Sequence, residues 1–315
     1  MRRRHDPFLK RLYRTGTRDA LTLFLPRLAA RIDWDQWQWL DKEVPILGRR
    51  RRSVVADLVG LTRDVEGRYL KVLVHPELQM RPDAEMDWRA LQYNAGLLLR
   101  EGNPGTRVLT VVFYHCPGVG GIRKHRFDME FYEEPSLLGL TYWSVGLGDL
   151  DAEPYAELEN PMGWALASWM RQRRETRVEL RLRLVEKILR FVRADEYQEL
   201  LLDTVESYYK LSRTEQRAEE RLIRSGRYGE VDEMAQTVLG RMKAKERREG
   251  RHEGEVAAVR RAVQRAILVR FPEAPPGLAD RVEEIRNVTA LENLLGRVIV
   301  AESVEEVERL LGADA

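Results

Sequence analysis

Three polar side chains, set within two aliphatic runs, have the types and the spacing of a metal site. Asp57 interrupts the first run, and Glu77 and Gln79 lie at the end of the second. Both runs are rich in β-branched residues and a polar turn separates them, so they predict a β-hairpin. Gly67 in that turn is ten residues from each carboxylate. A hairpin centred on Gly67 would place Asp57 and Glu77 opposite one another, with Cβ atoms about 5 Å apart.

A cation would stabilise two carboxylates at this separation. They repel by roughly 3 kcal/mol at an effective dielectric of ~20, and a bound cation or a shared proton removes that cost. Hard oxygen ligands favour Mg²⁺ or Mn²⁺ over zinc. Gln79 shares the face of Glu77, where its amide could orient water. The alternative is a polar, solvent-facing stripe on the hairpin, although aspartate is depleted in strands.

The elements that would hold these residues follow from hydrophobic periodicity. The chain reads as a helix broken near Gly16, three strands, a helix and a further strand, over residues 6–31, 37–46, 53–62, 69–79, 82–102 and 107–115. The last strand is aliphatic on both faces, which predicts a central position. A stripe of Trp88, Leu91, Ala95 and Leu98 predicts the face of the second helix that meets the sheet.

The remainder of the chain divides by composition. Strand patterns continue to about residue 147, and nearly everything after residue 161 has helical periodicity, with a capping-box pattern at Asp195–Gln198. We expect an α/β domain, a helical region, a charged linker and a small helical C-terminal module, over residues 1–155, 156–242, 243–255 and 256–315.

Four parts of this pattern together resemble the core motif of the PD-(D/E)XK nuclease superfamily. More narrowly, they are similar to the bacterial recombination-promoting nucleases, a family also described as transposase-like or Rpn-like. The resemblance covers about residues 5 to 150. Its parts are the opening segment with Asp6 and Lys10, the strand with Asp57, the sequence Glu77-Leu78-Gln79, and the helix with Arg89 and Tyr93.

The resemblance implies a fold and an activity. The fold would be a restriction-endonuclease-like core, a mixed central sheet flanked by helices, followed by an all-helical C-terminal region. The activity would be Mg²⁺- or Mn²⁺-dependent endonucleolytic hydrolysis of DNA, linked to recombination or mobile elements. Asp57, Glu77 and the carbonyl of Leu78 would hold the metal, and Gln79 would act beside them. Asp6, Lys10, Arg89 and Tyr93 would border the site or meet DNA.

Two departures from the superfamily pattern leave other functions open. Gln79 stands where the superfamily has lysine, and an amide carries no charge. Pro76 cannot donate a ladder hydrogen bond, which predicts a bulged or unpaired strand before Glu77. They support an inactive nuclease fold that binds DNA or protein. A third possibility is an assembly protein that acts through its long helices.

Composition bounds the remaining choices. The net charge of +2 does not indicate that the chain as a whole binds nucleic acid. A basic surface that contacts phosphates would therefore be local, at residues 49–52 or 123–126. A single cysteine, Cys116, excludes an intrachain disulfide and fits a reducing cytosol. No run approaches the ~20 apolar residues of a membrane span. We expect a cytoplasmic protein with DNA as partner and no membrane contact, and a homo-oligomer stays open.

Two further motifs fall short of a site. The glycine-rich loop 117–121 lacks the Gly-Lys-Ser/Thr of a P-loop, so no nucleotide cofactor is expected. His115, Cys116 and His125 lack the spacing of a four-ligand zinc site.

Overall fold

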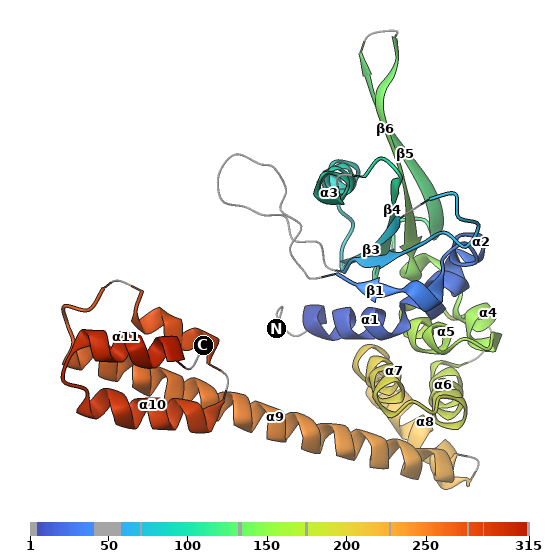
Figure 1. Ribbon diagram of the computed structural model, residues 1–315. Coiled ribbons are helices and arrows are strands. Elements are labelled where there is room, and N and C mark those ends of the chain that lie inside the picture. Colours follow the sequence, from blue (N-terminus) through green and yellow to red (C-terminus); the bar gives the residue numbers. More distant parts are fainter. Residues whose placement is uncertain are drawn as a thin grey trace. The chain divides into compact units, whose positions relative to one another are not determined.

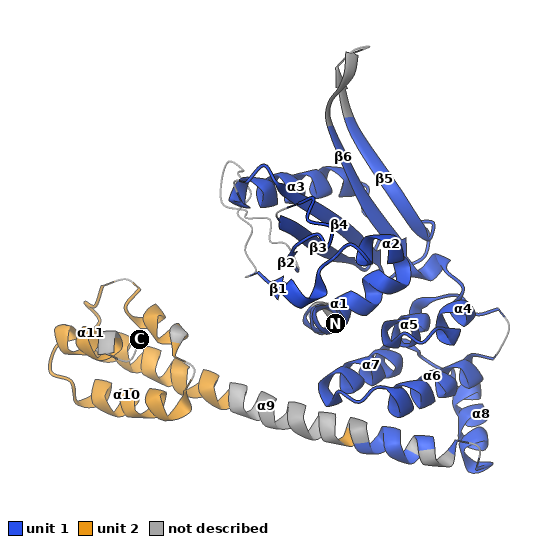
Figure 2. Cartoon of the chain, turned by 45° about the vertical axis from the view of Figure 1, so that its right-hand side comes forward, with its two compact units in different colours: residues 1–239 blue, residues 240–315 orange. Residues whose placement is uncertain are grey.

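The chain consists of two compact units, residues 1–239 and 240–315 (Figure 2). The computed structural model describes residues 5–40, 58–69, 71–101, 103–131, 134–173, 176–226, 228–275, 277–285 and 287–313. The first unit contains a six-stranded mixed sheet with helices around it (Figure 1), so the α/β class is confirmed. The predicted boundaries at residues 155, 242 and 255 stay predictions.

The first helix carries the predicted break. α1 (His5–Phe24) and α2 (Pro26–Ala29) cover the predicted segment, and the break lies at Gly16, whose φ of −102° and ψ of 15° are not helical. A Cβ at Gly16 would come within 2.6 Å of Met162 Sδ and 2.8 Å of the Tyr197 hydroxyl. The break therefore lies where α1 packs closely against two later helices.

The strands are ordered β1-β2-β3-β4-β6-β5 in the sheet. Their bounds are β1 Gln38–Trp39, β2 Gly60–Thr62, β3 Lys71–Gln79, β4 Thr106–Tyr114, β5 Ile122–Phe131 and β6 Glu134–Gly146. β2 and β3 form the predicted antiparallel hairpin, while β3 and β4 are parallel and joined by α3 (Met86–Glu101). β4 has a neighbour on each side, so its predicted central position is confirmed.

The bulge predicted at Pro76 is wrong for the pairing of β3 with β4. All nine residues of β3 pair in an unbroken register, with Pro76 opposite Val111. The carbonyl of Gln79 accepts from the amide of His115 at 2.8 Å, and backbone groups alternate in direction along a strand. The nitrogen of Pro76 therefore faces the β2 side, and its missing hydrogen removes no hydrogen bond from the β3–β4 ladder.

Alternation along β4 shows that two helices cover opposite faces of the sheet (Figure 1). Thr110 and Tyr114 meet α3, through Asn94 and a cluster with Met86 and Ala90. Phe113 lies on the other face, against Tyr13 of α1 with ring centroids 4.7 Å apart. A side chain on β3 therefore meets α3 or α1 according to its parity.

The face of α3 that meets the sheet differs from the predicted one. Trp88 is 49% exposed and Leu98 42%, whereas the buried side chains include Ala90, Tyr93 and Leu97. α3 has apolar residues on more than one side, and the sheet packs against the side that also carries Arg89 and Asn94. The helix thus turns polar groups inward over β3 and β4.

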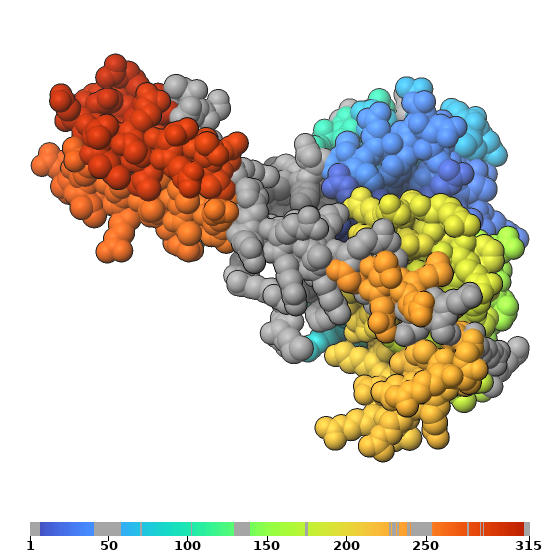
Figure 3. Space-filling model, turned by 90° about the horizontal axis from the view of Figure 1, so that it is seen from below, coloured from blue at the N-terminus to red at the C-terminus, as the bar shows by residue number. Residues whose placement is uncertain are grey.

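Five α-helices that follow the sheet lie wholly in the described part of the first unit. They are α4 (Ala152–Glu157), α5 (Pro161–Leu166), α6 (Arg177–Phe191), α7 (Asp195–Tyr208) and α8 (Arg213–Arg224). α7 lies against α1 (Figure 3), where the Tyr197 hydroxyl donates to Asp19 Oδ2 at 2.7 Å. Arg181 of α6 joins α7 and α8 by pairing with Glu206 and Glu219.

The predicted capping box at the start of α7 is wrong. The N-cap is Ala194, which has no side-chain acceptor, and the Gln198 amide donates instead to the carbonyl of Val192 at 2.7 Å. The side chain of Gln198 therefore caps the end of α6 rather than the start of its own helix.

The second unit is helical. α9 (Gly229–Arg270) runs into it across the unit boundary, and α10 (Val288–Val300) and α11 (Val304–Ala313) follow. Their shared core includes Val263, Ile267, Leu291, Val298 and Leu310. Within the described part of the chain, no helix combines the length and apolar composition that a membrane span requires.

We predict that Gly16→Ala lowers the free energy of unfolding by about 1–3 kcal/mol, because the new methyl group overpacks the contact with Met162 and Tyr197. Thermal and urea denaturation would measure the change. Thr15→Ala is the matched control, since Thr15 is exposed on the same turn and should shift stability by less than ~0.5 kcal/mol. Equal stability of both variants would show that α1 is not packed tightly at Gly16.

Candidate functional site

One face of β3 carries a row of polar side chains beneath α3. His75, Glu77 and Gln79 alternate along the strand and so share this face. His75 is 0% exposed and Glu77 is 2% exposed. A buried carboxylate requires partners, because removal of an ion from water costs several kcal/mol.

Three donors surround one oxygen of Glu77. Glu77 Oε1 accepts from Gln79 Nε2 at 2.7 Å, from Arg89 Nη2 at 2.7 Å and from the Tyr93 hydroxyl at 3.4 Å. Arg89 Nη2 also donates to the Tyr93 hydroxyl at 3.1 Å. The structure thus brings together four predicted residues from two elements, β3 and α3.

Arg89 links Glu77 to a second carboxylate, Asp83, in the turn before α3. Its Nη1 lies 2.5 Å from Asp83 Oδ2. Burial raises the pKa of Asp83, but hydrogen bonds from Arg89 and the Glu85 amide outweigh that effect and hold this pKa below its ordinary value. Burial lowers the pKa of Arg89, and hydrogen bonds to Tyr93 and Asp83 outweigh it in turn, so the pKa is raised.

The second oxygen of Glu77 has a different environment. Among the described residues, Glu77 Oε2 finds no hydrogen-bond donor, and His75 Nε2 finds no partner either. These two buried atoms lie 3.4 Å apart. Buried polar atoms without partners are uncommon in folded proteins and indicate an ion, a water molecule or a function.

The other predicted site residues are not part of the cluster that the described residues form around Glu77. Asp57 and the side chain of Asp6 lie outside the described residues. Lys10 is on α1, which packs on the sheet face opposite α3. Within the described ranges, no three His, Cys, Asp or Glu side chains are grouped as a metal site.

The remaining histidines belong to other surroundings. His115 lies on the α1 face, where its Nε2 is 3.2 Å from the Tyr13 hydroxyl and its ring meets Trp169 edge-on. His125 is on β5, with Nε2 2.7 Å from Ser144 Oγ and its ring stacked on Tyr142. Ring packing and single hydrogen bonds account for both positions, and His115 Nδ1 is buried without a partner among the described residues.

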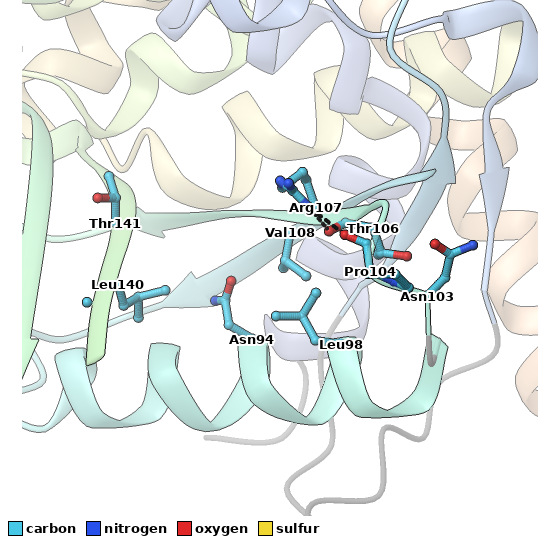
Figure 4. A pocket seen from close by; sticks show the side chains of 10 residues that line it. Asn94, Leu98, Asn103, Pro104, Thr106, Arg107, Val108, Leu140 and Thr141 are labelled. Carbon is cyan, nitrogen blue, oxygen red and sulfur yellow. Dashed lines mark hydrogen bonds between the residues drawn. The ribbon is translucent and has the colours of Figure 1, made fainter. Parts of the chain in front are cut away.

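A pocket of about 510 Å³ lies between α3 and the strands at the point where β4 and β6 diverge (Figure 4). Asn94 and Leu98 line it from α3, and Val108 and Leu140 line it from the two strands. None of the residues around Glu77 lines this pocket. We place the candidate chemistry at Glu77, because that is where buried charge and unpartnered atoms occur together.

Sequence reasoning missed two residues of this site. His75 could have been found from its spacing, since it precedes Glu77 by two residues on the same strand and so shares its face. Asp83 gave no such signal, because its contact with Arg89 depends on the turn between β3 and α3. Comparison of the chain with protein-family models, curated proteins and solved structures found no match in any of the three.

We predict that Arg89→Ala destabilises the chain by about 3 kcal/mol, because it leaves the buried carboxylate of Glu77 without its cation. Glu77→Gln in the same chain should recover part of this loss, giving a coupling energy of ~1–3 kcal/mol in a double-mutant cycle. Urea denaturation supplies the four stabilities.

The matched control for this cycle is Arg126→Ala, since Arg126 makes an exposed pair with Asp128 at 2.6 Å. This control should cost no more than ~0.5 kcal/mol. Additive effects of Arg89→Ala and Glu77→Gln would contradict the assigned ion pair.

We predict that the free energy of unfolding falls as the pH is lowered, because of His115. Burial lowers the pKa of His115 to about 4, whereas the unfolded chain binds this proton near pH ~6.5. Above ~6.5 both states are neutral. Between pH ~6.5 and the folded pKa, only the unfolded state is protonated. The free energy of unfolding therefore drops by up to ~1.4 kcal/mol for each unit by which the pH is lowered.

Urea titrations at pH values from ~7.5 down to ~4.5, in steps of ~0.5, would measure this slope. His115→Phe keeps a ring against Tyr13 and Trp169 and should remove it. His125→Gln should change it less, because His125 is only partly buried. An unchanged slope in His115→Phe would refute the assignment.

Proposed function

We propose that this chain is a metal-dependent DNA endonuclease of the PD-(D/E)XK type. The observation that carries the proposal is the carboxylate of Glu77, which is almost fully buried and has one oxygen, Oε2, without a donor among the described residues. A divalent cation bound at that oxygen would satisfy it. Mg²⁺ and Mn²⁺ fit a carboxylate ligand.

The order of elements supports this proposal. The first unit begins α1-α2-β1-β2-β3-α3-β4. With α1 and the short α2 taken as one broken helix, this is the α-β-β-β-α-β order that the resemblance to these nucleases implies. The pairing of β2 with β3 sets Gly60 opposite Val74 and Thr62 opposite Val72. This is the register that the predicted pairing of Asp57 with Glu77 requires.

The backbone of β3 supports it as well. The carbonyl of Gln79 faces β4, where it accepts from the His115 amide at 2.8 Å. By alternation, the carbonyl of Leu78 faces the β2 side, where the resemblance would place Asp57. Asp57, Glu77 and Leu78 would then hold the metal from one edge of β3.

The proposed chemistry assigns roles to residues in contact. When bound, the metal would activate water and stabilise charge on the phosphate oxygens. Arg89 and Tyr93 hold Glu77 Oε1, which fixes the carboxylate while Oε2 stays available. Gln79 Nε2 donates to Glu77, so its amide oxygen is the group that would accept a hydrogen bond from the attacking water.

DNA would find positive charge on the edge of the sheet. Arg123, Lys124 and Arg126 are exposed on β5, the outermost strand. This segment is part of β5. A two-stranded ribbon with basic side chains fits a groove of the duplex, where cations meet phosphates.

The alternative is an inactive nuclease fold that acts as a DNA-binding or protein-interaction module. A specific contact favours it, because Arg89 already places a positive charge 2.7 Å from Glu77 Oε1. This ion pair supplies part of the neutralisation that a metal would otherwise provide. Gln79 in place of the superfamily lysine adds to the case.

The test is cleavage of plasmid DNA by the full chain in the presence of Mg²⁺ or Mn²⁺. We expect cutting that requires the metal and disappears in Glu77→Gln. Gln79→Ala should lower the rate by roughly 10²-fold, as for loss of a group that positions water. Gln79→Lys should keep activity, because it restores the superfamily pattern.

Glu220→Gln is the matched control, since Glu220 is a carboxylate on α8 with an exposed arginine partner. It should cut at the wild-type rate. Binding of DNA by a wild-type chain that never cuts it, with either metal, would favour the interaction module.

A further inference from the structure

His75 and Glu77 present two unpartnered atoms to one another. Both side chains are buried, and the distance from His75 Nε2 to Glu77 Oε2 is 3.4 Å. Neither atom has a hydrogen-bond partner among the described residues. Arg89, Gln79 and Tyr93 all act on the other oxygen, Oε1, so these donors do not explain the second pair of atoms.

The surroundings of His75 allow Nε2 to be the ring nitrogen with the free lone pair. His75 Nδ1 lies 3.5 Å from Thr110 Oγ1, and this oxygen also accepts from Asn94 Nδ2 at 2.8 Å. Thr110 Oγ1 can accept from both groups because a hydroxyl oxygen has two lone pairs. In the tautomer that carries its proton on Nδ1, this N–H donates to Thr110 Oγ1 and the lone pair of Nε2 lies toward Glu77.

This tautomer creates a repulsion that a cation relieves. A lone pair on Nε2 and a carboxylate oxygen repel each other in a buried site, whereas both are ligands for a divalent metal. Histidines that bind metals typically donate their other ring N–H to a fixed acceptor, and Thr110 Oγ1 lies where it can be that acceptor for His75 Nδ1. The ring of Tyr93 packs against His75 with centroids 4.5 Å apart and further restricts its orientation.

We propose that His75 is a metal ligand alongside Glu77, so that the site takes a first-row transition-metal dication such as Mn²⁺ in preference to Mg²⁺. The inference rests on the proposed metal site and specifies its chemistry. The sequence predicted oxygen donors alone, which suit Mg²⁺ and Mn²⁺ alike. An imidazole nitrogen favours the transition metals, because Mg²⁺ selects oxygen ligands.

The experiment uses the full chain with Mn²⁺ alone as the probe. Pulsed electron paramagnetic resonance reports whether a ¹⁴N nucleus is bonded to the bound Mn²⁺, and calorimetry gives the affinities for Mn²⁺ and Mg²⁺. We expect ¹⁴N coupling in the wild type. His75→Leu should abolish the coupling and reduce the preference for Mn²⁺ by roughly tenfold or more, as loss of a ligand would.

Two further variants separate the outcomes. His125→Gln changes a histidine on β5 and should keep the coupling, whereas Glu77→Gln should remove metal binding. His75→Gln serves beside His75→Leu if the apolar replacement does not fold. Tight Mn²⁺ binding without ¹⁴N coupling, equal in wild type and His75→Leu, would overturn the role of His75 and leave the proposed nuclease site in place. Absence of Mn²⁺ and Mg²⁺ binding in the wild type would overturn both.

Discussion

A carboxylate that leaves water must meet opposite charge or hydrogen-bond donors, and the buried Glu77 imposes this requirement on the sheet and on α3. Arg89 satisfies it from 2.7 Å, with Gln79 and Tyr93 on the same oxygen. Because Arg89 and Tyr93 are four residues apart, they lie on one side of α3, and that side must therefore face β3. The orientation of the helix follows from the charge that it neutralises.

The topology makes this contact available. β3 and β4 are parallel, and a parallel pair needs a crossover connection that returns the chain over one face of the sheet. α3 is that crossover, so residues of its first two turns lie near the end of β3 where Glu77 and Gln79 occur. Pro76 is accommodated there because its nitrogen faces the β2 side, away from the continuous ladder with β4.

The balance of charge around Glu77 bears on both proposed functions. Within the described residues, one guanidinium, Arg89, faces two carboxylates, Glu77 and Asp83. Asp83 is partly solvated and needs little compensation, whereas Glu77 Oε2 and His75 Nε2 are buried without partners. Arg89 stabilises one oxygen of Glu77 and leaves the other without a donor among the described residues. The second oxygen is therefore available to an ion.

The sequence by itself determined the elements whose signals are local. β-branched runs, the turn at Gly67 and the break at Gly16 each depend on neighbouring residues, so the hairpin, the broken helix and the central β4 could be predicted. It also singled out Glu77, Gln79, Arg89 and Tyr93, although their mutual contacts were not visible in it. The tertiary structure decided which face of α3 is buried, because that helix has apolar residues on several sides and only the sheet, with Glu77 on it, selects among them. It likewise decided the cap of α7 and the roles of His75 and Asp83, since each depends on a partner brought near by folding rather than by position in the chain.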